Sequence, residues 1–227
     1  MSAANLPALC SWSGGKDSCL ALHLALESGI PVTRLLTVFE PDADRSRSHA
    51  LPLELLADQA AALGLELRSP RADWATYERV FVEELEHARE AGIGQAIFGD
   101  IDLVPHREWE EKVCRRAGLA AHLPLWNWAR ERVVAEILAR GMKAICVCII
   151  TRFLPEEFCG RAYDETFIRD LPGGVDACGE NGEFHTFVTH APRFTRPVDV
   201  RMRTRRRYVG PAEYGGEVYW FADLERA

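Results

Sequence analysis

The chain has 227 residues, of which 48% are hydrophobic and 27% charged, and its net charge is −7. These values are ordinary for a globular protein and exclude intrinsic disorder, a collagen-like repeat and a coiled coil, while the negative charge argues against a nucleic-acid partner. No apolar run approaches the roughly 20 residues of a membrane-spanning helix, and the first residues lack the pattern of a secretory signal. We therefore expect a cytoplasmic protein without a membrane partner.

The first two thirds of the chain alternate between apolar runs and helical patterns. The apolar runs predict strands over residues 6–12, 32–39, 66–68, 95–98 and 143–151. Apolar residues at helical spacing predict helices that end at Gly29, over 49–63, over 73–91, over 104–117 and over 131–140. This alternation predicts an α/β fold, with a doubly wound parallel five-stranded sheet and helices on both faces.

The pattern changes after residue 151. Strand-like runs over 184–189, 198–209 and 218–224 follow one short helix near 164–171. We interpret this part as a smaller C-terminal α+β appendage packed over the mouth of the sheet. The chain then divides into two domains, 1–151 and 152–227.

An arginine-rich segment lies in the second part. Seven arginines and one aspartate fall between Arg193 and Tyr208, which leaves a charge of −13 for the rest of the chain. Four of the arginines alternate and would share one face of a strand: Arg201, Arg203, Arg205 and Arg207. Such a face could dock an acidic protein, a phosphate-bearing substrate or RNA. It could also be a solvated edge that discourages association between sheets.

A glycine-rich loop follows the first expected strand. Its sequence is Ser13-Gly14-Gly15-Lys16-Asp17-Ser18. Two glycines before a helix start let backbone N–H groups converge on an anion, so the loop predicts a phosphate site. It is neither a Walker A element nor a GxGxxG loop. We expect the side chains of Lys16 and Asp17 to face solvent, with Asp17 available to Mg²⁺.

A second polar cluster precedes the strand at 184–189. Glu180, Asn181, Glu183, His185 and Thr186 lie within seven residues. Alternation would put Glu183 and His185 on one face, where carboxylates and an imidazole could orient an amine and remove its proton. We assign Glu180, Glu183 and His185 to catalysis, and Asn181 and Thr186 to substrate binding. A polar turn with an edge strand is the alternative.

Two further residues are candidates. Asp100 follows the strand at 95–98, on the same carboxyl edge of the sheet as the loop, and could hold Mg²⁺ or fix a carboxylate. The alternative for Gly99-Asp100 is an ordinary turn. His49, at the expected start of the second helix, could approach the nucleotide or the substrate, or be a surface residue.

The loop resembles the pyrophosphate loop (PP-loop) of the N-type ATP pyrophosphatases, in the adenine nucleotide alpha-hydrolase superfamily. The resemblance implies a Rossmann-like (HUP) sheet, with residues 1–151 as the ATP-binding domain and 152–227 as the substrate-binding domain. It also implies cleavage of ATP between its α and β phosphates, an adenylated substrate, and Mg²⁺ as usual with ATP. Several branches share the loop. The chain has no CxxC pair, which weighs against the thiolation branch.

A closer resemblance, over nearly all of residues 6–194, is to the diphthine–ammonia ligase family. It is carried by Phe98-Gly99-Asp100-Ile101, Arg107-Glu108-Trp109, Pro124-Leu125-Trp126 and Gly174-Val175-Asp176-Ala177-Cys178-Gly179-Glu180-Asn181-Gly182-Glu183-Phe184-His185-Thr186. The resemblance implies a ligase that adenylates a carboxylate, joins it to ammonia, and releases AMP and pyrophosphate.

The chain departs from that family at three positions of the second cluster. Asn181 stands for a glycine, His185 for a glutamate and His190 for an aspartate, as in a branch suggested for bacteria. The two lost carboxylates predict an acceptor other than diphthine, whose trimethylammonium cation they would attract. The alternatives are an enzyme of cobamide salvage or RNA modification, or a nucleotide-binding module without turnover. The acceptor, protein or small molecule, stays open, and so does a homodimer.

Overall fold

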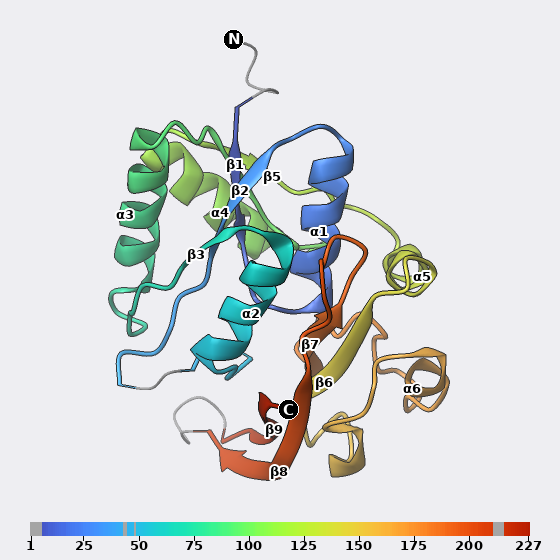
Figure 1. Cartoon of the computed structure of the whole chain (residues 1–227). Coiled ribbons are helices and arrows are strands. Elements are labelled where there is room, and N and C mark those ends of the chain that lie inside the picture. The colour runs from blue at the N-terminus through green and yellow to red at the C-terminus, as the bar shows by residue number, and fades with distance from the viewer. Residues whose placement is uncertain (1–5, 43–44, 48, 211–215) are drawn as a thin grey trace.

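The structure is a computed structural model that describes residues 6–42, 45–47, 49–210 and 216–227. Its elements form one parallel and one antiparallel sheet, with helices around the parallel one (Figure 1). The elements are β1 (Ala8–Ser11), α1 (Lys16–Glu27), β2 (Val32–Leu36), α2 (Leu53–Leu63), β3 (Glu66–Arg68), α3 (Tyr77–Glu90), β4 (Gln95–Ile97), α4 (Val104–Ala117), β5 (Ala120–His122), α5 (Arg130–Ala139), β6 (Lys143–Ile150), α6 (Glu165–Arg169), β7 (Phe184–His190), β8 (Val200–Val209) and β9 (Val218–Arg226), with a 3₁₀ turn at Glu156–Phe158.

The parallel sheet has the strand order β3-β2-β1-β4-β5. Residues of α1, α2 and α5 pack in the core on one face, and residues of α3 and α4 pack in a second core on the other. Figure 1 shows these two helical layers on opposite sides of the strands. The doubly wound α/β fold expected from the alternation is therefore confirmed.

The strand expected at 143–151 is present, but the prediction that it belongs to the parallel sheet is wrong. It forms β6, which is a central strand of the antiparallel sheet β7-β6-β9-β8. The fifth strand of the parallel sheet is instead β5, three residues that pair with β4. A continuous apolar run indicates a strand buried on both faces, and it does not distinguish a parallel from an antiparallel neighbour.

Two helices begin later than expected. The segment before α2 forms backbone hydrogen bonds of its own, such as Ser46 N to Leu51 O at 2.8 Å, and α2 begins only after Pro52. A residue before proline is disfavoured in helical conformation, which explains the late start and places His49 in a loop. Helix α3 was expected from residue 73 but begins after Thr76, whose backbone N–H donates to the Asp73 carboxylate.

The two sheets are joined at the glycine-rich loop. Val188 of β7 donates its backbone N–H to Gly14 O at 2.8 Å. The buried amide of Gln59, on α2, donates to both Gly14 O and Val188 O, and accepts from the Trp12 indole. This contact sets the polar residues of β7 beside the loop. None of the helices among the described residues is long and apolar enough to cross a membrane.

Candidate functional site

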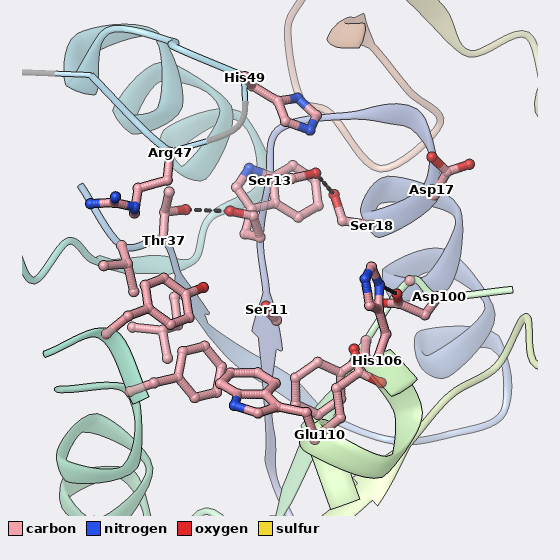
Figure 2. Close-up of a pocket in the computed structure, with 18 of the residues that line it drawn as sticks. Ser11, Ser13, Asp17, Ser18, Thr37, Arg47, His49, Asp100, His106 and Glu110 are labelled. Carbon is pink, nitrogen blue, oxygen red and sulfur yellow. Dashed lines mark hydrogen bonds and ion pairs between the residues drawn. The ribbon is translucent and has the colours of Figure 1, made fainter. Parts of the chain in front are cut away.

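A cavity of about 710 Å³ opens at the carboxyl ends of β1, β2 and β4. The strand order reverses between β1 and β4, and ligands of open α/β sheets bind at such a reversal. Figure 2 shows Ser13 and Ser18 of the loop on the wall of the cavity, with Asp100 and His106 beside them. The loop therefore lies where the fold places phosphate ligands.

The two glycines of the loop are required by its packing. Gly14 has φ +79°, and a Cβ atom there would lie 2.6 Å from Leu56 Cδ2. At Gly15 a Cβ atom would lie 2.8 Å from His49 Cε1. The Ser13 hydroxyl accepts from Gly15 N and lies 3.0 Å from Ser18 Oγ, which closes the turn before α1.

Lys16 does not face solvent, which corrects the expectation from the sequence. The residue is 2% exposed, and its Nζ donates to Asp17 Oδ2 at 2.7 Å and to Cys178 O at 2.5 Å. Burial lowers the pKa of Lys16, but the Asp17 carboxylate, Tyr163 and Cys178 together outweigh burial, and the net pKa is raised. Lys16 is therefore a buried cation that ties the loop to the second polar cluster.

Asp17 keeps one carboxylate oxygen without a partner. Its Oδ1 is buried and accepts no hydrogen bond from any described residue, while Oδ2 is held by Lys16. Burial raises the pKa of Asp17, an effect that Lys16 opposes. An unpartnered buried carboxylate oxygen suits a cation, and Asp17 lines the cavity with Asp100.

Asp100 belongs to a chain of three titratable groups. His106 Nδ1 donates to Asp100 Oδ1 at 2.7 Å, and the Glu110 carboxyl bonds the same aspartate. Burial and the bond to Asp100 raise the pKa of Glu110 to about 11, so Glu110 is protonated at neutral pH. Burial raises the pKa of Asp100, but its two hydrogen-bond partners outweigh burial and lower it. Asp100 is therefore ionised and held in place.

A second cavity of about 510 Å³ adjoins the first, and Asp17, His49, Asp100, His106, Glu180 and His185 line both. Glu180 accepts from Ile101 N at 3.3 Å. Burial, followed by the charge of Asp17, raises the pKa of Glu180 to about 7. A carboxyl group with this pKa can exchange a proton near neutral pH.

Glu183 lies apart from both cavities, although its neighbours line the smaller one. It is 2% exposed, and its carboxylate accepts from Asp176 N, Asn181 N and Asn181 Nδ2 at 3.0 to 3.2 Å. These bonds close the turn that carries Glu180. The contacts support a positioning role for Glu183.

The two histidines that line both cavities stack on each other. The rings of His49 and His185 have centroids 4.5 Å apart, and His49 Nδ1 donates to Thr186 O at 3.0 Å. Burial and His185 lower the pKa of His49 well below its ordinary value. Burial, with a contribution from Lys16, lowers the pKa of His185 to about 4. Both rings are neutral at neutral pH.

The structure thus brings most of the expected site residues together. Two of them have side chains that are already engaged: the Thr186 hydroxyl accepts from Lys16 N, and the Asn181 amide donates to Glu183. His190, at the other end of β7, pairs with Lys143 and lines neither cavity. Charge at position 190 therefore does not act directly on a ligand in either cavity.

Sequence reasoning missed four residues of this region: Arg47, Gln59, His106 and Glu110. A polar residue on an otherwise apolar helix face was the available signal for Gln59. For His106 and Glu110 the signal was their spacing of four, which puts both on one face of a helix. Arg47 lines the larger cavity, and its guanidinium lies 4.2 Å from the ring centroid of Trp74.

Two family models match the chain. Residues 7–121 match the model described as diphthamide synthase N-terminal domain, and residues 129–222 match the C-terminal domain of the same family. The chain belongs to the diphthamide synthase family. The family indicated by the sequence motifs is therefore confirmed.

Several relatives of this diphthamide synthase family member carry the name diphthine–ammonia ligase. The protein from Mus musculus is 28% identical over 221 residues, which cover 83% of this chain and 80% of the mouse chain. The Homo sapiens protein is 25% identical with the same coverage. The Schizosaccharomyces pombe protein is 23% identical, and the match covers 82% of this chain and 34% of that one.

A solved structure also aligns with the chain. It is described as a predicted subunit of tRNA methyltransferase from Methanocaldococcus jannaschii. The alignment has 18% identity and a TM-score of 0.45, and it covers 82% of this chain and 98% of that one.

Proposed function

We propose that this protein is an ATP-dependent ligase that adenylates a carboxylate, releases pyrophosphate and joins the acyl group to ammonia. One observation carries the proposal: the glycine-rich loop and the cluster at 180–186 border two adjoining cavities that share six polar residues. An enzyme of this kind needs a nucleotide and a carboxylate side by side. The relatives named diphthine–ammonia ligase favour this reaction over cobamide salvage, RNA modification and a module without turnover.

The proposed reaction has two steps. A carboxylate oxygen of the acceptor attacks the α-phosphorus of ATP, and the bond between the α-phosphorus and the oxygen of the β-phosphate breaks. The leaving pyrophosphate is held by the glycine-rich loop. Ammonia then attacks the acyl carbon and AMP leaves, while the nitrogen loses one proton. We propose that the Glu180 carboxylate accepts this proton, because its pKa of about 7 suits proton exchange near neutral pH, whereas the pKa of His185 is about 4.

We propose Mg²⁺ as the cation used with ATP, held by Asp17 and Asp100. The unpartnered Asp17 Oδ1 supports this choice. No group of three or more metal-binding side chains is present in the described parts of the chain, but Mg²⁺ bound with a nucleotide takes most ligands from phosphates and water. When bound, the ion screens the phosphate charge.

The reaction is tested by its products. The protein is incubated with ATP labelled at the α-phosphate, ammonium and an acceptor, and the nucleotides are separated by chromatography. AMP and pyrophosphate are expected, because a loop that grips pyrophosphate leaves the α-phosphate open to attack. Accumulation of ADP and free phosphate in their place would contradict the proposal.

The first acceptor to test is a diphthine-bearing elongation factor, since diphthine is the acceptor in the names of the relatives. The prediction of a different acceptor is still untested, and the neutral His49–His185 pair supports it. The test compares the unmodified protein with His185→Glu. Slow amidation that the variant accelerates supports a different natural acceptor, and efficient amidation by the unmodified protein contradicts it.

A further inference from the structure

Strand β8 is a long and exposed edge strand. It pairs with β9 along one side only, and no backbone hydrogen bond joins residues 201–208 to any other described part of the chain. Figure 1 shows β8 at the outer border of the antiparallel sheet. Met202 is 41% exposed, Tyr208 43% and Val209 51%. An edge of this kind is a template for pairing with another polypeptide.

The positive charge of β8 is only partly neutralised. Arg201 and Arg203 reach the same carboxylate, that of Glu225 on β9, with side chains 69% and 63% exposed. Arg207 makes no ion pair or hydrogen bond with the described residues. Two arginines therefore share one acidic partner, and a third has none, so the strand keeps a surplus of positive charge.

Strand β9 contacts the segment before α2, part of which lines the larger cavity. Asp223 of β9 accepts from Arg45 Nη2 at 2.6 Å. Two residues beyond Arg45, Arg47 lines the cavity. The sheet that carries β8 is therefore connected to this segment by an ion pair.

We propose that β8 docks an extended acidic segment of another protein, which adds to the sheet as a further strand. Exposed Met and Tyr side chains among arginines are typical of protein interfaces. Pairing with a second copy of β8 would bring two arginine-rich strands side by side, and like charges on neighbouring strands are destabilising, which disfavours that occupant. A free backbone edge suits a polypeptide rather than a nucleic acid, and the rest of the chain is strongly negative. The inference does not depend on the reaction proposed above.

The test uses the full chain and a fluorescein-labelled peptide of ten alternating threonine and glutamate residues. A second peptide has lysine in place of glutamate, and a third probe is a labelled 12-nucleotide poly(U) RNA. Arg203→Gln with Arg207→Gln is the test variant. Arg79→Gln with Arg115→Gln, on exposed positions of α3 and α4, is the control with the same change of charge.

Fluorescence anisotropy should show the acidic peptide binding at least tenfold more tightly than the lysine peptide. The β8 variant should weaken binding at least fivefold, and the control variant should not. Hydrogen exchange of the β8 amides should slow in the complex. Equal binding of both peptides, an unaffected β8 variant, or unprotected β8 amides would overturn the proposal. So would tighter binding of the RNA, or a dimer of the unmodified chain that the β8 variant loses in sedimentation.

Discussion

Lys16 is a buried cation that contributes to the stability of the fold through its ion pair and its hydrogen bond. Its ammonium group joins the glycine-rich loop to the carbonyl of Cys178, 162 positions later, with Asp17 as counter-ion. Breaking a buried ion pair by removing one partner typically costs about 3–5 kcal/mol, because the remaining charge stays buried. Burial therefore gives Lys16 a structural role in addition to the role in ATP binding that we propose for it.

We expect Lys16→Ala to lower the free energy of unfolding by roughly 3 kcal/mol and to abolish ATP binding. Denaturant titration measures the first effect and calorimetric titration with ATP the second. Lys112→Ala is the control, since Lys112 is half-exposed and pairs with Glu78. A variant that unfolds at the same denaturant concentration as the unmodified protein would show that the buried bonds of Lys16 do not matter.

The raised pKa of Glu180 predicts how the rate of the proposed reaction depends on pH. Its pKa is raised to about 7, and only the ionised form can take a proton from the nitrogen. The rate should therefore rise with pH to a plateau, with a midpoint near pH 7. Glu180→Gln should lower kcat by roughly 10²–10⁴ and remove the midpoint. A midpoint that persists in the variant would assign it to another group, such as His106, whose pKa is raised by Asp100.

Among the elements, the end of β4 and the start of α1 approach closely at Gly99. A Cβ atom at this position would lie 2.8 Å from Ser18 N and 2.9 Å from Asp17 C, both backbone atoms that cannot rotate away. The missing side chain is thus what lets Asp100 lie beside the loop. This requirement explains the glycine before the aspartate.

Gly99→Ala should push β4 away from α1, weaken ATP binding and destabilise the protein by about 1–3 kcal/mol, the usual cost of overpacking. Gly173→Ala is a matched control, because a Cβ atom there meets nothing within 4 Å. Thermal unfolding and ATP titration of both variants check the prediction. Equal stability and affinity of the two variants would mean that the close approach relaxes without consequence.

For the whole molecule, Gln59 joins the parallel sheet to the antiparallel one. Its fully buried amide serves three partners, the Trp12 indole, Gly14 O and Val188 O. Leucine in its place would remove the partner of the Trp12 indole and the amide donor of Val188 O, at about 1–3 kcal/mol for each buried group, whereas Gly14 O would keep its bond from Val188 N. This side chain therefore reinforces the backbone hydrogen bond between Val188 and Gly14 at the contact between the sheets.

Gln59→Leu should lower the free energy of unfolding by about 2–6 kcal/mol and loosen the contact between the two sheets, so that amides of β7 exchange faster than those of β1. Gln95→Leu is the control, since among the described residues its amide nitrogen donates only to Leu6 O. Hydrogen exchange read by mass spectrometry compares the two variants. Uniform exchange in Gln59→Leu would indicate that other contacts hold the sheets together.

The sequence by itself determined the alternation of strands and helices, the phosphate loop and the family, because glycine spacing, apolar periodicity and contiguous motifs are local properties of the chain. The division into domains 1–151 and 152–227 is still a prediction. Tertiary structure decided that β6 joins the antiparallel sheet, since a buried strand has the same apolar sequence pattern whether its neighbours are parallel or antiparallel. It also decided that Lys16 is buried and that Glu110 keeps its proton, because residues distant in sequence set the solvent access and partners of these groups.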